Sequence, residues 1–359
     1  MVQYIQVLRC IAALAVVIHH VQTFTNIRLD APHIGYLGRA GVDMFFVISG
    51  FVMVHTTRKG GRGVIQFWTD RAVRIVPMYW LAIALLVAAA SAGFYLADFS
   101  KISVADVIED LFFIPHYRAD GDPYPIVNVG WTLTFEMYFY FLFALTFWMR
   151  SQVKALLALS AYFLATWLAV KQIHPHLLAF NMLSQPITLE FVAGGVLALL
   201  YRQKDPLPVG LRPWVGWALI GVGCAALIAA AFSVGSEANK DFALRTIAFG
   251  APSVLIVGGV LELEKTRRKE TAGWLMLLGA ASYAIYLFHY PVANVVVLGA
   301  ELMFGNHTSI LVALTAGIVA TVVVTLMGIA IHLKLEKPAT AALKDAFGAL
   351  GRRRAAKPA

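Results

Sequence analysis

The chain has 359 residues, of which 60% are hydrophobic and only 14% are charged, and its mean hydropathy is +0.73. This composition is too apolar for a soluble α/β or all-α domain, so it excludes the soluble fold classes and indicates a protein that folds in lipid. The formal net charge of +9 is mainly a signal of membrane topology, and we expect no nucleic-acid partner from it.

Apolar stretches long enough to cross a bilayer recur along the whole chain, since a hydrocarbon core of about 30 Å needs roughly 20 helical residues. We therefore predict an all-α integral membrane protein, a bundle of about ten transmembrane helices in one domain over residues 1–338. The predicted spans cover residues 5–25, 37–57, 75–97, 130–148, 155–172, 183–202, 213–233, 244–264, 273–298 and 308–333. The first span lacks the features of a cleaved signal peptide, and we interpret it as retained.

The basic residues predict which ends of the spans face the cytoplasm, because lysine and arginine are retained on that side. Most of the 29 basic residues fall in alternate connections when the N-terminus is placed inside. Both termini, including a basic tail over residues 339–359, are therefore predicted to be cytoplasmic. Cys10 and Cys224 have neither metal-ligand spacing nor a disulfide pattern, and we expect no metal.

The longest outer connection is predicted over residues 98–130. It is expected to hold a short amphipathic helix, residues 103–114, which Ser103 can cap and which would lie over the outer mouth of the bundle.

The first span carries two ionisable residues, Arg9 and His20. A charge inside the bilayer is functional by default, because burying it is costly. The two residues are eleven positions apart, close to three helical turns, so they lie on one face about 16 Å from each other. The alternative is that Arg9 extends to lipid phosphate and that His20 satisfies a neighbouring carbonyl.

Two carboxylates enter the outer half of the predicted bundle. Asp43 lies near the outer end of the second span and Glu136 more than a turn inside the fourth, and a buried carboxylate needs a partner or a proton. Asp43 also has a structural alternative, as a partner for Arg39 or for a helix N-terminus. Ser49 and Gly50, in the same span as Asp43, are interpreted as small residues that let helices pack closely.

Two further pairs share a helix face. Arg71 and Arg74 lie at the inner mouth, where guanidinium groups suit the two-pronged binding of phosphate; ordinary positive-inside charge is the alternative. Tyr286 and His289 lie in the ninth span at the depth of His20, although an aromatic belt at the interface would also explain them. Pro291 is predicted to kink or unwind the outer end of that helix.

Six segments together resemble the membrane-bound acyltransferase-3 family, the integral-membrane O-acyltransferases that modify bacterial envelope and secreted glycans. The six segments are Arg9 with His20, residues 41–51, residues 71–80, residues 131–136, residues 282–291 and residues 335–338. Each one alone is unspecific, whereas all six in this order cover nearly the whole chain. Thr132 stands where the family commonly has serine, so the hydroxyl is kept.

The resemblance implies a multi-pass protein of the bacterial inner membrane that takes an acetyl or other short acyl group from cytoplasmic acyl-CoA. The group would pass to a carbohydrate acceptor at the outer face, an exopolysaccharide or a lipid-linked glycan, with membrane lipid as a further partner. The residues that the resemblance places at the acetyl-CoA donor are Arg9, Arg71 and Arg74. It places His20 at the essential histidine.

Attack of a sugar hydroxyl on a thioester requires a base and hydrogen-bond donors for the oxyanion. We expect His20 to be the base, with Glu136 or Asp43 orienting its imidazole. The side chains expected to bind substrate are Trp131, Tyr286 and His289. Two other classes stay open: a secondary transporter or glycan flippase, which would not consume acetyl-CoA, and a structural membrane subunit.

Overall fold

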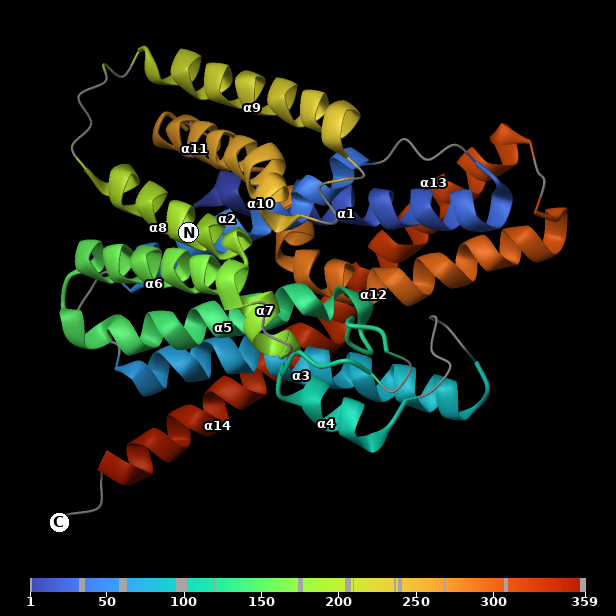
Figure 1. The fold of residues 1–359 in the computed structure, drawn as a ribbon, viewed down its shortest axis with the longest axis horizontal. Helices are drawn as coiled ribbons and strands as arrows, with labels where there is room; N and C mark the ends of the chain where they lie inside the picture. The colour runs from blue at the N-terminus through green and yellow to red at the C-terminus, as the bar shows by residue number, and fades with distance from the viewer. Residues whose placement is uncertain are drawn as a thin grey trace.

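The structure is a computed structural model of the chain. The residues that it describes are 2–31, 36–57, 63–94, 102–118, 121–173, 177–203, 208, 210–235, 237, 241–267, 269–306 and 309–355. Every regular element within these ranges is helical (Figure 1), which confirms the predicted all-α fold. The basic residues predicted for the cytoplasmic side at 58, 59, 62, 204, 268 and 357 lie outside the described ranges.

Nine helical segments of the described chain are long and apolar enough to cross a membrane. They contain α1 (Gln3–Leu29), α2 (Ala40–Thr56), α3 (Val64–Ser91), α5 (Trp131–Leu145), α6 (Gln152–Ile173), α9 (Arg212–Val234), α10 with α11 (Phe242–Arg245 and Ala251–Lys265), α12 (Gly273–Phe304) and α13 (Ile310–Ile331). The sixth predicted span, residues 183–202, differs. Its residues fold as the end of α7 (Leu178–Leu183), a short turn η4 (Pro186–Thr188) and α8 (Leu189–Arg202), whose 14 residues span only about 21 Å.

The short helix α8 packs directly on α2. A Cβ atom on Gly50 would lie 1.9 Å from the carbonyl oxygen of Phe191, and one on Gly194 would lie 1.9 Å from that of Val47. The two backbones are therefore in contact, and only glycine fits at this crossing. The packing role predicted for Gly50 is confirmed.

Two helices differ from the predicted boundaries. α3 begins at Val64, eleven residues before the predicted span, so Arg71 and Arg74 lie well inside a helix. α12 runs through Pro291 to Phe304, so its outer end does not unwind, and the predicted alternative of a kink at Pro291 stays a prediction. Because proline has no N–H, the carbonyl oxygen one turn before Pro291 lacks its helical hydrogen bond, and this is tolerated where neighbouring helices cover that oxygen.

The two ends of the bundle carry different appendages (Figure 1). After α13, the turn η7 (His332–Glu336) leads into α14 (Lys337–Ala355), which packs on α3 and projects from the bundle. The helix α4 (Val104–Leu111) lies at the opposite end of α3, where Trp80 donates to the carbonyl oxygen of Leu111 at 3.0 Å. We call these the α14 end and the α4 end.

The short helix predicted over residues 103–114 is confirmed as α4, and Ser103 caps it; its place over the outer mouth stays a prediction. The Ser103 hydroxyl accepts from the Asp106 amide at 3.1 Å, and the Asp106 carboxylate accepts from the Ser103 amide at 2.7 Å. Burial raises the pKa of Asp110 to about 6, while the Ile126 amide, which donates to that carboxylate at 2.6 Å, opposes the shift. Asp110 thus accepts from the Ile126 amide and fixes the chain that leads into α5.

Candidate active site

A cavity of about 300 Å³ lies among α1, α2, α3, α5 and α12. Five of the nine predicted site residues line it: Arg9, Arg71, Arg74, Glu136 and Tyr286. They come from four helices that are far apart in the sequence. The fold thus brings the predicted donor-binding arginines to the same hollow as one predicted carboxylate and one predicted tyrosine.

A second, more open hollow of about 600 Å³ adjoins the cavity at the α14 end. Arg71 and Arg74 line both, so the two hollows meet at these side chains. The other residues that line the second hollow are Asp70, His332, Glu336, Lys337, Thr340, Ala341 and Lys344. We call it the basic vestibule, because its cationic side chains outnumber its two carboxylates.

The arginines of the cavity have neutral partners. Arg9 donates to the Gln6 side chain at 3.1 Å, and Arg71 donates to the Thr56 hydroxyl at 3.1 Å while its buried Nε has no hydrogen-bond partner. Within the described chain no carboxylate forms an ion pair with Arg9, Arg71 or Arg74. Guanidinium groups without a carboxylate in hydrogen-bond contact suit the binding of an anion, although the Glu136 carboxylate lines the same cavity.

Glu136 faces the cavity and is held by two hydroxyl groups. Ser49 donates to its Oε1 at 2.8 Å, and Tyr140 donates to the same oxygen. Ser49 therefore does more than allow close packing, since it hydrogen-bonds a buried carboxylate. Neither bond of Glu136 goes to His20, so the structure does not bring this carboxylate to the imidazole that it was expected to orient.

The partner of His20 is another histidine. His289 Nε2 lies 2.9 Å from His20 Nδ1, and the two ring centres are 4.9 Å apart. His289 is fully buried, and its Nδ1 lies 2.5 Å from the carbonyl oxygen of Tyr286. The predicted common depth of the two histidines is thus realised as direct contact.

The contacts of the pair define its tautomers. A carbonyl oxygen only accepts, so His289 Nδ1 must carry the proton, and the Nε2 of neutral His289 must accept. His20 Nδ1 must then be the donor, which also suits the Val16 carbonyl oxygen 3.2 Å away. Neutral His20 therefore keeps its lone pair on Nε2, which no side chain of the described chain hydrogen-bonds.

Tyr286 connects the cavity with the histidine pair. Its hydroxyl lines the cavity and hydrogen-bonds the Thr132 hydroxyl at 2.8 Å and the Val129 carbonyl oxygen at 3.3 Å. His289 follows on the same helix face, with its ring centre 5.8 Å from that of Tyr286. Thr132 thus uses its hydroxyl at the boundary between the cavity and the pair.

Asp43 belongs to a different cluster. Arg245 binds its carboxylate through two bonds of 3.1 Å and 3.0 Å, and the buried Glu190 lies against the same pair. Trp131 covers the Arg245 guanidinium at 5.5 Å and does not line the cavity. The partner of Asp43 is therefore Arg245, and the suggested pairing with Arg39 is wrong.

Arg245 and Glu190 were not predicted from the sequence, although the high cost of a charge inside a membrane span, which singled out His20, applies to them as well. Both residues fall inside predicted spans, where a charge is unexpected. The signal was present, but their partner Asp43 lies more than 140 positions away from either one.

Residues 2–330 match the family model of the acyltransferase domain, and the chain belongs to the acyltransferase-3 family. It is thus a multi-pass membrane protein of an acyltransferase family, as the sequence resemblance indicated.

Three curated relatives are similar along most of the chain. The exopolysaccharide production protein ExoZ of Rhizobium meliloti is 34% identical over 84% of this chain and 89% of its own length. The acyltransferase MdmB of Streptomyces mycarofaciens is 27% identical over 92% and 89%. The peptidoglycan O-acetyltransferase OatA of Listeria monocytogenes is 23% identical over 79% of this chain and 48% of its own length. No solved structure matches the chain.

Proposed function

We propose that this protein is an O-acyltransferase that moves an acetyl or other short acyl group from cytoplasmic acyl-CoA to a hydroxyl of an exopolysaccharide or other envelope glycan. The acceptor class follows the names of the relatives, two of which refer to exopolysaccharide production and to peptidoglycan O-acetylation. The single observation that carries the proposal is the histidine pair, which leaves a lone pair on His20 Nε2. Neither histidine lines the cavity, but Tyr286, which does, contacts His289 of the pair.

The α14 end is assigned to the cytoplasm, because basic residues are retained on that side. The lysines of the basic vestibule and the arginines that it shares with the cavity would bind the phosphates of CoA. The cavity, at about 300 Å³, is at the lower end of ligand-pocket volumes and suits the narrow acyl-bearing arm rather than the nucleotide.

His20 is the proposed general base. Its Nε2 takes the proton of the acceptor hydroxyl as that oxygen attacks the thioester carbonyl carbon, and His289 Nε2 holds the imidazole in the required tautomer. The carbon–sulfur bond then breaks, and the imidazolium returns the proton to the sulfur. The ester and free CoA are the products, so atoms and charge balance.

Two neighbouring groups have supporting roles in the proposal. The Tyr286 and Thr132 hydroxyls line the cavity and share the Val129 carbonyl oxygen as an acceptor. Tyr286 would exchange its longer bond to Val129 for one to a carbonyl oxygen that develops negative charge, while Thr132 orients the Tyr286 hydroxyl. Glu136, held by Ser49 and Tyr140, would set the charge of the cavity near Arg9. Trp131 and Asp43 are proposed to support the walls from the Arg245 cluster.

The experiment that tests the proposal uses purified protein in sealed proteoliposomes with acetyl-CoA and an acceptor glycan. We expect thiol release and acetylated glycan, both lost in the His20→Ala protein. Glycan movement across the vesicle membrane without thiol release would instead identify a transporter and contradict the proposal.

A further inference from the structure

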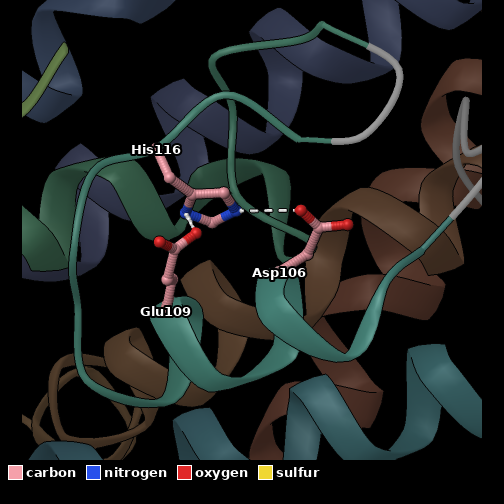
Figure 2. A group of neighbouring side chains, drawn as sticks. All are labelled: Asp106, Glu109 and His116. Carbon is pink, nitrogen blue, oxygen red and sulfur yellow. Dashed lines mark ion pairs between the residues drawn. The ribbon is translucent and has the colours of Figure 1, made fainter. Parts of the chain in front are cut away.

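A group of ionisable side chains at the α4 end takes no part in the proposed reaction. Asp106 and Glu109 lie one turn apart on α4, and His116 lies in the chain that follows the helix. Figure 2 shows the imidazole ring of His116 between the two carboxylates, with one ring nitrogen directed at each. One ligand atom from each of the three residues lies within 4.8 Å of the others.

The hydrogen bonds of His116 leave one nitrogen facing a carboxylate. Its Nδ1 lies 3.0 Å from the carbonyl oxygen of Ile114, which can only accept, so the neutral ring carries its proton there. Its Nε2 then holds a lone pair, is buried without a hydrogen-bond partner, and points at Asp106 Oδ1 3.5 Å away. The whole His116 side chain is only 8% exposed.

Two acceptors that face each other in a buried place need a cation between them. The separation of 3.5 Å is long for a hydrogen bond, for which 2.7–3.2 Å is usual. It fits two ligands of one metal ion, because bonds of about 2.1 Å at tetrahedral angles hold ligand atoms roughly 3.4 Å apart. The contact of Nδ1 with a backbone carbonyl is also the usual support of a metal-binding histidine.

The surrounding groups hold the carboxylates in place. The other oxygen of Asp106 accepts from the Ser103 amide at 2.7 Å, which leaves Oδ1 for a ligand. Glu109 Oε2 lies 3.5 Å from His116 Nδ1, on the other side of the ring, but this side chain is 40% exposed and can turn toward an ion bound at Nε2. Asp110 Oδ1 lies 3.9 Å from the same Nδ1. Arg118, the nearby cation, forms its ion pair with Asp122 at 2.8 Å.

We propose that Asp106, Glu109 and His116 form a site for a divalent cation that accepts both nitrogen and oxygen ligands, with Zn²⁺ as the first candidate. One histidine with two carboxylates suits Zn²⁺ or Mn²⁺ better than Ca²⁺ or Mg²⁺, which prefer oxygen alone. This chemistry differs from the expectation of no metal, which considered the cysteines and their spacing.

The site would act on structure rather than on the reaction. It joins α4 to the chain that follows, and the adjacent Asp110 fixes the Ile126 amide just before η2 (Asn128–Gly130). Tyr286 hydrogen-bonds the Val129 carbonyl oxygen in that turn. A bound ion would therefore stabilise the segment that positions one wall of the cavity.

The test uses the purified full-length protein after treatment with a chelator. Addition of Zn²⁺ is expected to give about one bound ion per chain by elemental analysis and a higher melting temperature, and Co²⁺ is expected to give visible absorption bands of a nitrogen-containing site. His116→Gln and Glu109→Gln should each weaken Zn²⁺ binding by at least roughly tenfold.

The matched control is His332→Gln, which removes a histidine from another histidine–carboxylate pair, with Glu336 at 2.8 Å. It should bind Zn²⁺ at this site as the wild type does. Equal Zn²⁺ binding by wild type and His116→Gln would overturn the proposal. So would wild-type protein that binds neither Zn²⁺ nor Co²⁺, since a protonated imidazole would then fill the gap between the carboxylates. The Co²⁺ spectrum needs only wild-type protein and decides the question even if a variant fails to fold.

Discussion

The bundle holds two pairs of ionisable side chains that differ in how fully their hydrogen-bonding groups are used. Asp43 and Arg245 are both buried and form two bonds with each other, with Glu190 beside them. His20 and His289 form one bond, which leaves the second nitrogen of His20 with a lone pair. A charge inside a membrane bundle is thus a weak sign of catalysis by itself, whereas a side-chain lone pair that no neighbouring side chain uses is a stronger one.

The largest effect is expected from His20→Ala. Loss of a general base should reduce the rate of acyl transfer by about 10²–10⁴-fold, while loss of one hydrogen bond of about 1 kcal/mol should hardly change the melting temperature. Rate and melting temperature are measured on the same purified preparation. The control is His19→Ala, since His19 accepts from Arg39 at 3.2 Å and has no bond to His289, so it should retain most activity.

Asp43→Asn should lower the stability of the protein more than its rate of acyl transfer, which is the reverse of the effect expected for His20→Ala. Removing one partner leaves the Arg245 charge buried without its anion, which costs about 3–5 kcal/mol in comparable buried pairs. Denaturation in detergent is expected to show this loss, and the double variant Asp43→Leu with Arg245→Met should recover much of it. If Asp43→Asn keeps its stability but loses all transfer, the cluster is catalytic and the comparison fails.

Arg71→Ala tests the anion-binding side of the cavity. One charged hydrogen bond is worth about 1.5–3 kcal/mol, so the acetyl-CoA KM should rise by roughly 10-fold to 100-fold with a smaller change in kcat. Arg150→Ala is the control, because Arg150 is exposed at the end of the α5 segment and lines neither hollow. Equal KM values for the two variants would show that Arg71 serves topology only.

The smallest effect is expected at His289, where the rates of two different substitutions are compared. His289→Gln can keep an acceptor near His20 Nδ1, whereas His289→Leu cannot, so the leucine variant should be slower by an order of magnitude at most. A kcat that falls with little change in KM, and that is partly retained in the glutamine variant, would identify a positioning residue. Equal loss in both variants would contradict the tautomer assignment.

The spans were predictable from the sequence because membrane helices follow from apolar length alone. α8 was not, since the apolar run over residues 183–202 continues across Pro186, and only the structure shows that the helix starts after it. The candidate residues were likewise predictable from the sequence, because an ionisable side chain inside a membrane span costs free energy to bury and is therefore unexpected there. Their partners were not, because His20 and His289 are 269 positions apart and helix packing decides which side chains meet.

The most direct test of the account measures donor binding and acyl transfer together on purified His20→Gln. Glutamine keeps much of the volume of histidine but cannot accept the proton of a hydroxyl at neutral pH. We expect acetyl-CoA to bind with an affinity within about twofold of wild type, because the arginines are intact, and transfer to be lost. Transfer at the wild-type rate would show that His20 is not the base and would contradict the central claim.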